Sequence, residues 1–106
     1  MTQSKTEGME DRLVRLADMA KALSHPARIK ILEILTKKNT CVCGEIVELL
    51  PLSQSTVSQH LKELKRVGFI RGDIEGPKTC YCVNKKTMDR AKRLFSELFS
   101  RSFKCC

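Results

Sequence analysis

Cysteines are the residues of this sequence best suited to chemistry, because a thiolate binds soft ions and two thiols can oxidise to a disulfide. The chain has six cysteines, and they fall into three close pairs, Cys41-Val42-Cys43, Cys80-Tyr81-Cys82 and Cys105-Cys106. In a reducing cytoplasm such spacing favours metal binding or thiol sensing over a disulfide scaffold.

The spacing of Cys41 and Cys43 limits what the two thiols can share. Two residues apart on a regular helix they diverge by about 200°, so one ion binds both only where the helix begins or is distorted. Thiolates with no histidine nearby favour thiophilic ions such as As(III), Sb(III), Cd(II) or Pb(II). The alternative is that both are small buried hydrophobic residues, as unpaired cysteines often are.

Cys80 and Cys82 are expected on one face of a strand, where residues two apart point the same way. We interpret them as packing residues, with a secondary thiol pair as the alternative. A zinc site made of both Cys-x-Cys pairs is a weaker alternative, because structural zinc sites space paired ligands by two or more residues.

Neither His25 nor His60 stands in a nucleophile signature, so we predict that the protein is not an enzyme.

One amphipathic helix over residues 52–65 organises the rest of the chain. Val57, Leu61 and Leu64 recur with the spacing of a buried helical stripe. Ser53 is suited to cap the start, and Gly68 to take the left-handed conformation that closes the end.

The outer face of this helix carries short uncharged polar side chains, which suit the edges of DNA bases better than they suit plain solvation. The side chains predicted at the major groove are Gln54, Ser55, Thr56, Ser58 and Gln59, and His60 is predicted as a DNA or capping contact. The cations expected at phosphates or at the minor groove are Lys62, Lys65, Arg71 and Lys78.

The flanking segments predict a winged helix-turn-helix, which is a mainly α fold with a small β-hairpin. A short helical pattern over 44–50 stops at Pro51, and β-type runs over 69–74 and 79–83 enclose a turn at 75–78. Three further helices are expected. The first carries a narrow apolar stripe of Leu13, Leu16, Ala17, Ala20 and Leu23, and the second, after Pro26, turns Ile29, Leu32 and Leu35 inward. The last, after a Thr87 cap, carries Met88, Ala91, Leu94, Phe95, Leu98, Phe99 and Phe103.

Length and charge bound the class of protein. A chain of 106 residues with a formal charge of +8 fits one domain with a polyanionic partner. We expect a mobile arm over 1–8, a DNA-binding and dimerisation domain over 9–103 and a cysteine tail over 104–106. No apolar run is long enough to span a membrane, and no secretory signal is present, so a cytoplasmic location is expected. The wide apolar stripe of the last helix predicts a homodimer.

Residues 10–103 resemble the ArsR/SmtB family of winged-helix repressors that respond to metals and metalloids. The resemblance rests on residues 23–29 (LSHPARI), on Cys41-Val42-Cys43 opening a third helix, and on residues 52–61 (LSQSTVSQHL). It implies that the protein without inducer sits on a double-stranded DNA operator, needs no cofactor to do so, and is released by its inducer.

Two departures from the family pattern concern its ligands. Arsenite-sensing members follow the Cys-x-Cys with Asp and then a third Cys, where this chain has Gly44 and Ile46. Zinc-sensing members carry Asp, His and Glu on the last helix, whose start here reads Lys85-Lys86-Thr87. We therefore expect Cys105 or Cys106 to join Cys41 and Cys43 around As(III) or Sb(III); a frayed, non-functional chain end is the alternative.

Two other functions fit the same residues. In one, a DNA-binding repressor senses oxidants or persulfides through its thiols. In the other, the chain is a zinc-stabilised nucleic-acid-binding module without regulation, which would purify with stoichiometric zinc.

Overall fold

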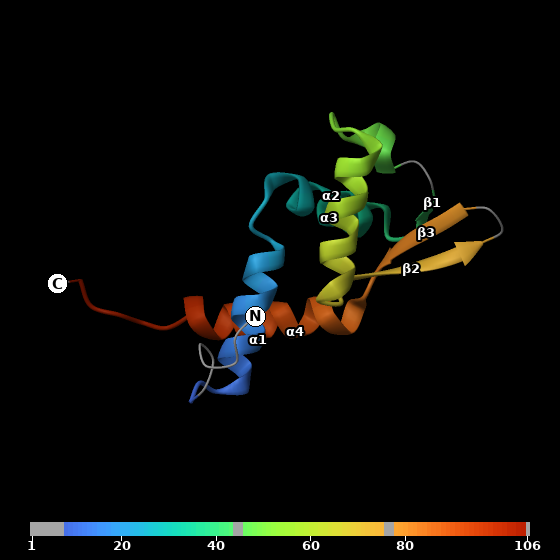
Figure 1. Cartoon of the computed structure of the whole chain (residues 1–106). Helices are drawn as coiled ribbons and strands as arrows, with labels where there is room; N and C mark the ends of the chain where they lie inside the picture. Colours follow the sequence, from blue (N-terminus) through green and yellow to red (C-terminus); the bar gives the residue numbers. More distant parts are fainter. Residues whose placement is uncertain (1–7, 44–45, 76–77, 106) are drawn as a thin grey trace.

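The computed structural model describes residues 8–43, 46–75 and 78–105, without the side chains of residues 43, 73–75 and 78. Its elements, in chain order, are α1 (Asp11–Ala22), α2 (Pro26–Lys38), β1 (Val42–Cys43), the 3-10 helix η2 (Ile46–Leu49), α3 (Gln54–Arg66), β2 (Ile70–Glu75), β3 (Lys78–Val83) and α4 (Lys85–Phe99). Figure 1 shows the strands at one end of the molecule and the C-terminal tail at the other. The predicted winged helix-turn-helix is confirmed.

The central helix forms as its sequence predicts. The Ser53 hydroxyl accepts a hydrogen bond from the Thr56 backbone N–H at 3.3 Å, which satisfies a free donor of the first turn of α3. Gly68 has a φ of 90°, a conformation that glycine adopts without strain, and it follows the last turn. The predicted inward residues Val57, Leu61 and Leu64 are all buried.

Helix α2 begins at Pro26, in the first turn, where the missing N–H of proline costs no helical hydrogen bond. His25 caps the helix, because its Nδ1 accepts a hydrogen bond from the Ala27 N–H. Asn39, in the left-handed conformation with a φ of 51°, ends the helix. Ile31 fills the core from this helix. The prediction that Ile29 points inward is wrong, because its side chain is 55% exposed.

Helix α4 differs from its prediction at both ends. Asn84, not Thr87, is the N-cap, and its side-chain oxygen accepts from the Thr87 backbone N–H. The helix ends at Phe99, so Phe103 lies beyond it in the tail. Asn and Thr are both favoured caps, so residue type alone does not decide which of the two begins the helix.

The sheet has three antiparallel strands in the order β1-β3-β2, one more than the predicted hairpin. The expectation that Cys41-Val42-Cys43 opens a helix is wrong, because Val42 and Cys43 form strand β1. Val42 is a β-branched residue that is buried in the core and pairs with Tyr81 of β3. In the predicted 44–50 helix, only the short η2 is helical among the described residues.

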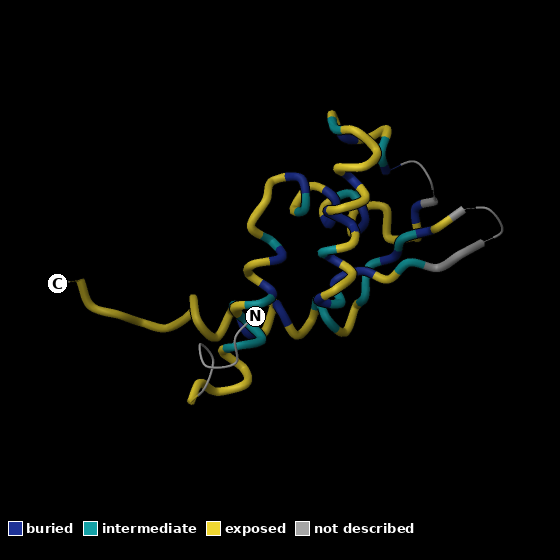
Figure 2. Tube along the Cα trace, viewed as in Figure 1, coloured by how far each residue is buried: buried dark blue, intermediate teal, exposed yellow. Residues whose placement is uncertain are grey.

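A single core holds these elements together. Helix α2 packs on α3, and α1 packs on α4. Met19, Ile31, Leu64 and Phe69 are among its fully buried side chains, and Figure 2 shows the buried segments where the helices cross.

No helix in the described part of the chain is long and apolar enough to cross a membrane.

Candidate nucleic-acid interface and cysteine site

The polar face of α3 lies on the surface of the molecule (Figure 2). Its exposed members are Gln54, Ser55, Thr56, Ser58 and Gln59, the residues predicted to read bases. Three hydroxyls at the start of the helix are linked, because the Ser53 hydroxyl donates to that of Thr56 at 2.9 Å and lies 3.3 Å from that of Ser55. The helix therefore presents an ordered row of short donors and acceptors.

Positive side chains continue this surface from α3 onto the sheet. Lys62 and Lys65 of α3 and Arg71 of β2 are exposed. The Lys65 ammonium lies beside Gly72 of β2, 3.5 Å from where a Cβ would stand. The Lys78 side chain, also predicted to contact phosphate, lies outside the described residues.

His60 is not on this surface, which corrects its prediction as a DNA contact. It is 8% exposed, and its ring packs on the His25 ring with 4.3 Å between centroids. Its Nδ1 accepts a hydrogen bond from Arg28 Nε at 3.1 Å. His60 follows Val57 by three residues, the spacing that places both on one helix face, so the helical period itself indicated an inward side chain.

Burial lowers the pKa of His60, and the nearby His25 and Arg28 lower it further. A neutral imidazole can accept the Arg28 hydrogen bond at Nδ1, whereas an imidazolium would place two positive groups together. The remaining ring nitrogen, Nε2, is buried without a hydrogen-bond partner among the described residues. The neutral His60 ring is therefore part of the contact between α3 and α2.

The C-terminal end of α3 is tied to α1 by charged groups. Arg66 donates to both carboxylate oxygens of Asp18, at 2.9 and 3.3 Å, and to Glu63 at 2.7 Å. The Arg66 hydrogen bonds are the largest cause that lowers the pKa of the Asp18 and Glu63 carboxyl groups. Arg15 of α1 adds a hydrogen bond to the Val67 carbonyl. The polar face of α3 is thus fixed relative to α1.

The cysteines of β1 and β3 meet across the sheet. Cys41, just before β1, forms a disulfide with Cys82 of β3, with 4.4 Å between their Cα atoms. Cys80 is also disulfide-bonded, and the residue opposite it in the register is Cys43. The expectation that a disulfide is the weaker interpretation, and that Cys82 serves only for packing, is therefore corrected. Two sequence pairs that looked separate form one group because β1 and β3 are neighbours.

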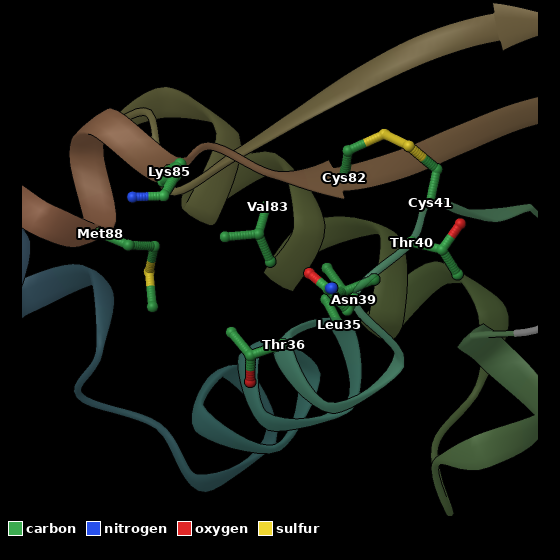
Figure 3. A pocket seen from close by; sticks show the side chains of 9 residues that line it. All are labelled: Leu35, Thr36, Asn39, Thr40, Cys41, Cys82, Val83, Lys85 and Met88. Atoms are coloured by element: carbon green, nitrogen blue, oxygen red, sulfur yellow. A yellow bond between two sulfur atoms is a disulfide. The ribbon is translucent and has the colours of Figure 1, made fainter.

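The disulfide borders a pocket of about 400 Å³ (Figure 3). The pocket lies between the end of α2, the end of β3 and the start of α4, and its lining includes Thr36, Asn39, Cys41, Cys82 and Met88. Cys41 is exposed, whereas Cys82 is 6% exposed. Of the two bonded cysteines, Cys41 is therefore the one that is open to solvent beside the pocket.

Cys105 is not brought to this site within one chain. Cys105 is an exposed thiol in the tail, which leaves α4 on the side away from the sheet (Figure 1). Cys106 and the Cys43 side chain lie outside the described residues. Across the described parts of the chain, no three His, Cys, Asp or Glu side chains form a ready metal-binding group.

Comparison with known proteins agrees with this geometry. Residues 25–71, which include α3 and the start of β2, match the family model described as bacterial regulatory protein, arsR family. The chain belongs to the ArsR family. It is 30% identical to the transcriptional repressor PagR of Bacillus anthracis over 82 residues, which cover 77% of this chain and 82% of PagR.

Two further comparisons extend the match. The arsenical resistance operon repressor of Staphylococcus xylosus is 32% identical to this ArsR-family chain over 74 residues, 70% of each protein. The structure of HlyU from Vibrio cholerae superposes with a TM-score of 0.69 at 27% identity, and the match covers 88% of this chain and 100% of HlyU. The first two relatives are named as repressors, and HlyU shares the fold of this chain.

The buried His60 predicts a pH-dependent stability. Because the pKa of His60 is lowered in the folded protein, the unfolded chain binds a proton at His60 more readily than the folded chain does. The contribution of His60 to the free energy of unfolding is therefore complete above its ordinary pKa of about 6.5 and is lost as the pH falls below that value. A His60→Gln variant keeps an acceptor for Arg28 but cannot titrate. Its thermal unfolding should lose less stability than the parent between about pH 7.5 and 5.5, a range around that pKa. An equal loss in both proteins would contradict this role.

The exposed face of α3 predicts two kinds of DNA contact. Gln59→Ala should cost roughly 1 to 3 kcal/mol of discrimination at one base pair and little elsewhere. Lys62→Ala, one turn along the same helix, should weaken binding to all sequences alike and lower the salt slope by about one unit. Operator variants titrated at several salt concentrations separate the two effects. Uniform loss in Gln59→Ala, or an unchanged slope in Lys62→Ala, would remove that residue from the interface.

Proposed function

We propose that this ArsR-family chain is a homodimeric transcriptional repressor that binds a double-stranded DNA operator and leaves it when As(III) or Sb(III) binds Cys41 and neighbouring thiols. The observation that carries the proposal is the position of Cys41, which lies at the chain segment between α2 and the helix-turn-helix and joins Cys82 of the wing. A ligand at Cys41 therefore acts on both elements that would contact DNA.

The operator is bound by α3 in the major groove and by the wing at the backbone. Support comes from the exposed short polar side chains of α3, from the exposed Lys62, Lys65 and Arg71, and from the net charge of +8. The protein acts in the cytoplasm, with its DNA, where thiols stay mainly reduced.

The inducer is a thiophilic ion because the soft donors at this position are cysteine sulfurs. Cys41 and Cys82 line the pocket, and no histidine or carboxylate is among the residues that line it. Soft thiolates select trivalent arsenic and antimony over hard cations. The Staphylococcus xylosus relative, named as an arsenical resistance operon repressor, adds support for this ligand class.

The dimer forms through the exposed apolar residues of α1, α4 and the tail. Leu13 is 38% exposed, Leu98 53%, Phe99 74% and Phe103 89%. Apolar side chains gathered in this way are typical of a surface that another chain covers. A two-fold dimer would place the two α3 helices about 34 to 36 Å apart, one turn of DNA.

A second candidate function is a thiol-redox repressor, favoured by the Cys41–Cys82 disulfide itself. In that case formation of the disulfide, rather than binding of an ion, changes the tie between β1 and β3 and releases the operator. The two candidates use the same sulfurs in different oxidation states, so the redox state of the assay separates them.

Operator release tests the inducer. Protein kept reduced by a phosphine, which does not compete as a thiol, is bound to operator DNA and titrated with As(III), Sb(III), Cd(II), Zn(II) or, after removal of the reductant, a peroxide. As(III) and Sb(III) should release the DNA at the lowest concentrations, because their soft acceptor character matches three thiolates. Release by peroxide alone would favour the redox repressor, and stoichiometric zinc in purified protein would favour the unregulated zinc module.

A charge on the apolar face tests the dimer. Leu98→Glu should shift the protein to monomers in sedimentation at micromolar concentration and weaken operator binding, because it places a carboxylate in the interface. Ile29→Glu is the matched control, since Ile29 is 55% exposed and belongs to α2, which is not one of the elements proposed to form the interface. Leu94 is unsuitable because it is 7% exposed in the chain's own core. Dimers that persist in Leu98→Glu would contradict the interface.

A further inference from the structure

Both histidines of the chain lie in one junction between α2 and α3. Their rings pack with 4.3 Å between centroids. Each ring accepts a hydrogen bond at Nδ1, His25 from the Ala27 N–H and His60 from Arg28 Nε, both at 3.1 Å. A neutral imidazole that accepts at Nδ1 carries its proton at Nε2, so this geometry holds both rings in the neutral form.

The buried position of the His60 ring has no acceptor for an imidazolium. Both nitrogens of a protonated ring carry a hydrogen. The hydrogen on Nδ1 would face the N–H of Arg28, and Nε2 is buried with no hydrogen-bond partner among the described residues. The ring is only 8% exposed, so it does not turn to water without leaving its place. Uptake of a proton must therefore break the Arg28 hydrogen bond and move the ring.

The charged groups that act on His60 also oppose a proton there. Burial is the largest cause that lowers the pKa of His60, and His25 and Arg28 of α2 lower it further. A second proton in the junction, on His25, would add another positive charge to a ring 4.3 Å away. The α2 side of the junction therefore stabilises only the neutral form of His60.

Carboxylates on the adjoining helices are bonded elsewhere. Glu63, one turn along α3, and Asp18 of α1 both accept hydrogen bonds from Arg66. The other charged side chains of α1 near them, Arg15 and Lys21, are cations that lower the pKa of Asp18. Within the described residues, no carboxylate is left to pair with a charged imidazole in the junction.

We propose that Arg28 and His60 position α3 for base readout, and that uptake of a proton by His60 releases the operator. The repressor then responds to acidification through residues that are separate from its cysteines. This inference rests on operator binding, which is one part of the proposed function, and it is independent of the inducer.

Loss of the Arg28 contact affects base readout more than phosphate binding. Gln59 is next to His60 on α3, so any rotation of the helix moves the two together. A hydrogen bond to a base needs a donor–acceptor distance of about 2.7 to 3.2 Å, which a short side chain cannot restore by reaching further. Lys62 and Lys65 have long flexible stems and still reach phosphates. Proton uptake therefore lowers discrimination between sequences before it lowers affinity for DNA in general.

The sign of the pH response separates this device from surface electrostatics. A proton on an exposed group adds positive charge and strengthens binding to phosphates. A proton on His60 adds the same charge but disturbs α3, so specific binding falls as the charge rises. Histidine is the only side chain with an ordinary pKa between about 5 and 8, and the chain has two histidines, so the response can be assigned to one of them.

Operator titrations between about pH 7.5 and 5.5, a range around the ordinary histidine pKa, test the device. The probe is a duplex selected by this protein from a random-sequence pool at the upper pH, and a scrambled duplex of equal length reports nonspecific binding. The ratio of the two affinities should fall on acidification, by up to about tenfold per chain one unit below the ordinary pKa of about 6.5. Affinity for the scrambled duplex should hold or rise. Far-ultraviolet circular dichroism at each pH reports folding.

Variants of the two histidines assign the proton. His60→Asn places an amide oxygen as many bonds from Cβ as Nδ1, so it accepts from Arg28 but does not titrate, and its affinity ratio should not change with pH. His60→Gln serves the same purpose if His60→Asn does not fold. His25→Asn is the matched control, because asparagine is a favoured cap that still accepts from the Ala27 N–H. It should keep the acid response of the parent.

Arg28→Lys tests the positioning role at the upper pH. Lysine keeps the positive charge, but it lacks the planar group with which Arg28 donates to the His60 ring and to two carbonyl oxygens of α1. The affinity ratio should fall several-fold without acidification, while binding to the scrambled duplex is unchanged. An unaltered ratio would remove Arg28 from this role.

The outcomes separate this inference from the proposed function. A parent that shows no sequence preference at the upper pH overturns the proposed function. A parent whose preference is the same at both ends of the pH range, or falls only together with the helical circular-dichroism signal, overturns only this inference. An acid response that persists in His60→Asn, or disappears in His25→Asn, also overturns it.

Discussion

One guanidinium group joins three helices of this protein, and the position of the polar face of α3 depends on it. Arg28 donates to the carbonyl oxygens of Lys21 and Ala22, at 3.4 and 3.3 Å, and to the imidazole of His60 at 3.1 Å. It therefore bonds carbonyl oxygens at the negative end of α1 and a neutral ring on α3 at the same time. Because each partner is an acceptor, the junction requires His60 to stay uncharged.

A second charged contact prevents α3 from turning about that junction. The carboxylates of Asp18 and Glu63 flank Arg66 at the last turn of α3, and Arg15 bonds the carbonyl of Val67 just beyond it. An exposed ion pair alone contributes about 0 to 1 kcal/mol. Here the Arg66 ion pair serves to orient the helix. Together with the His60–Arg28 contact about one and a half turns earlier, it fixes which face of α3 points outward. Helix α1 takes part in both and also carries exposed apolar residues, so the reading face is tied to the surface proposed for dimerisation.

How much the sequence could predict follows from how local each feature is. The period and caps of α3 depend on neighbours within one or two turns, and Ser53, Val57 and Gly68 behave as predicted. For His60 the two local indications conflict. The helical period predicts an inward side chain, whereas its polar character favours the surface, and the structure follows the period. Strand β1 has two residues, too few for any period, and it forms because β3, nearly forty residues later, offers it a partner. That pairing is tertiary and leaves no local signature.

The cysteines show why spacing alone could not define the site. A Cys-x-Cys pair diverges on a helix but converges on a strand, so the same two residues allow opposite conclusions until the element is known. Once β1 pairs with β3, two motifs that are weak alone place sulfurs across and along one sheet face. Arg71, which is predicted to contact DNA, is the register partner of the disulfide-bonded Cys82, so the two features lie on a single strand pair.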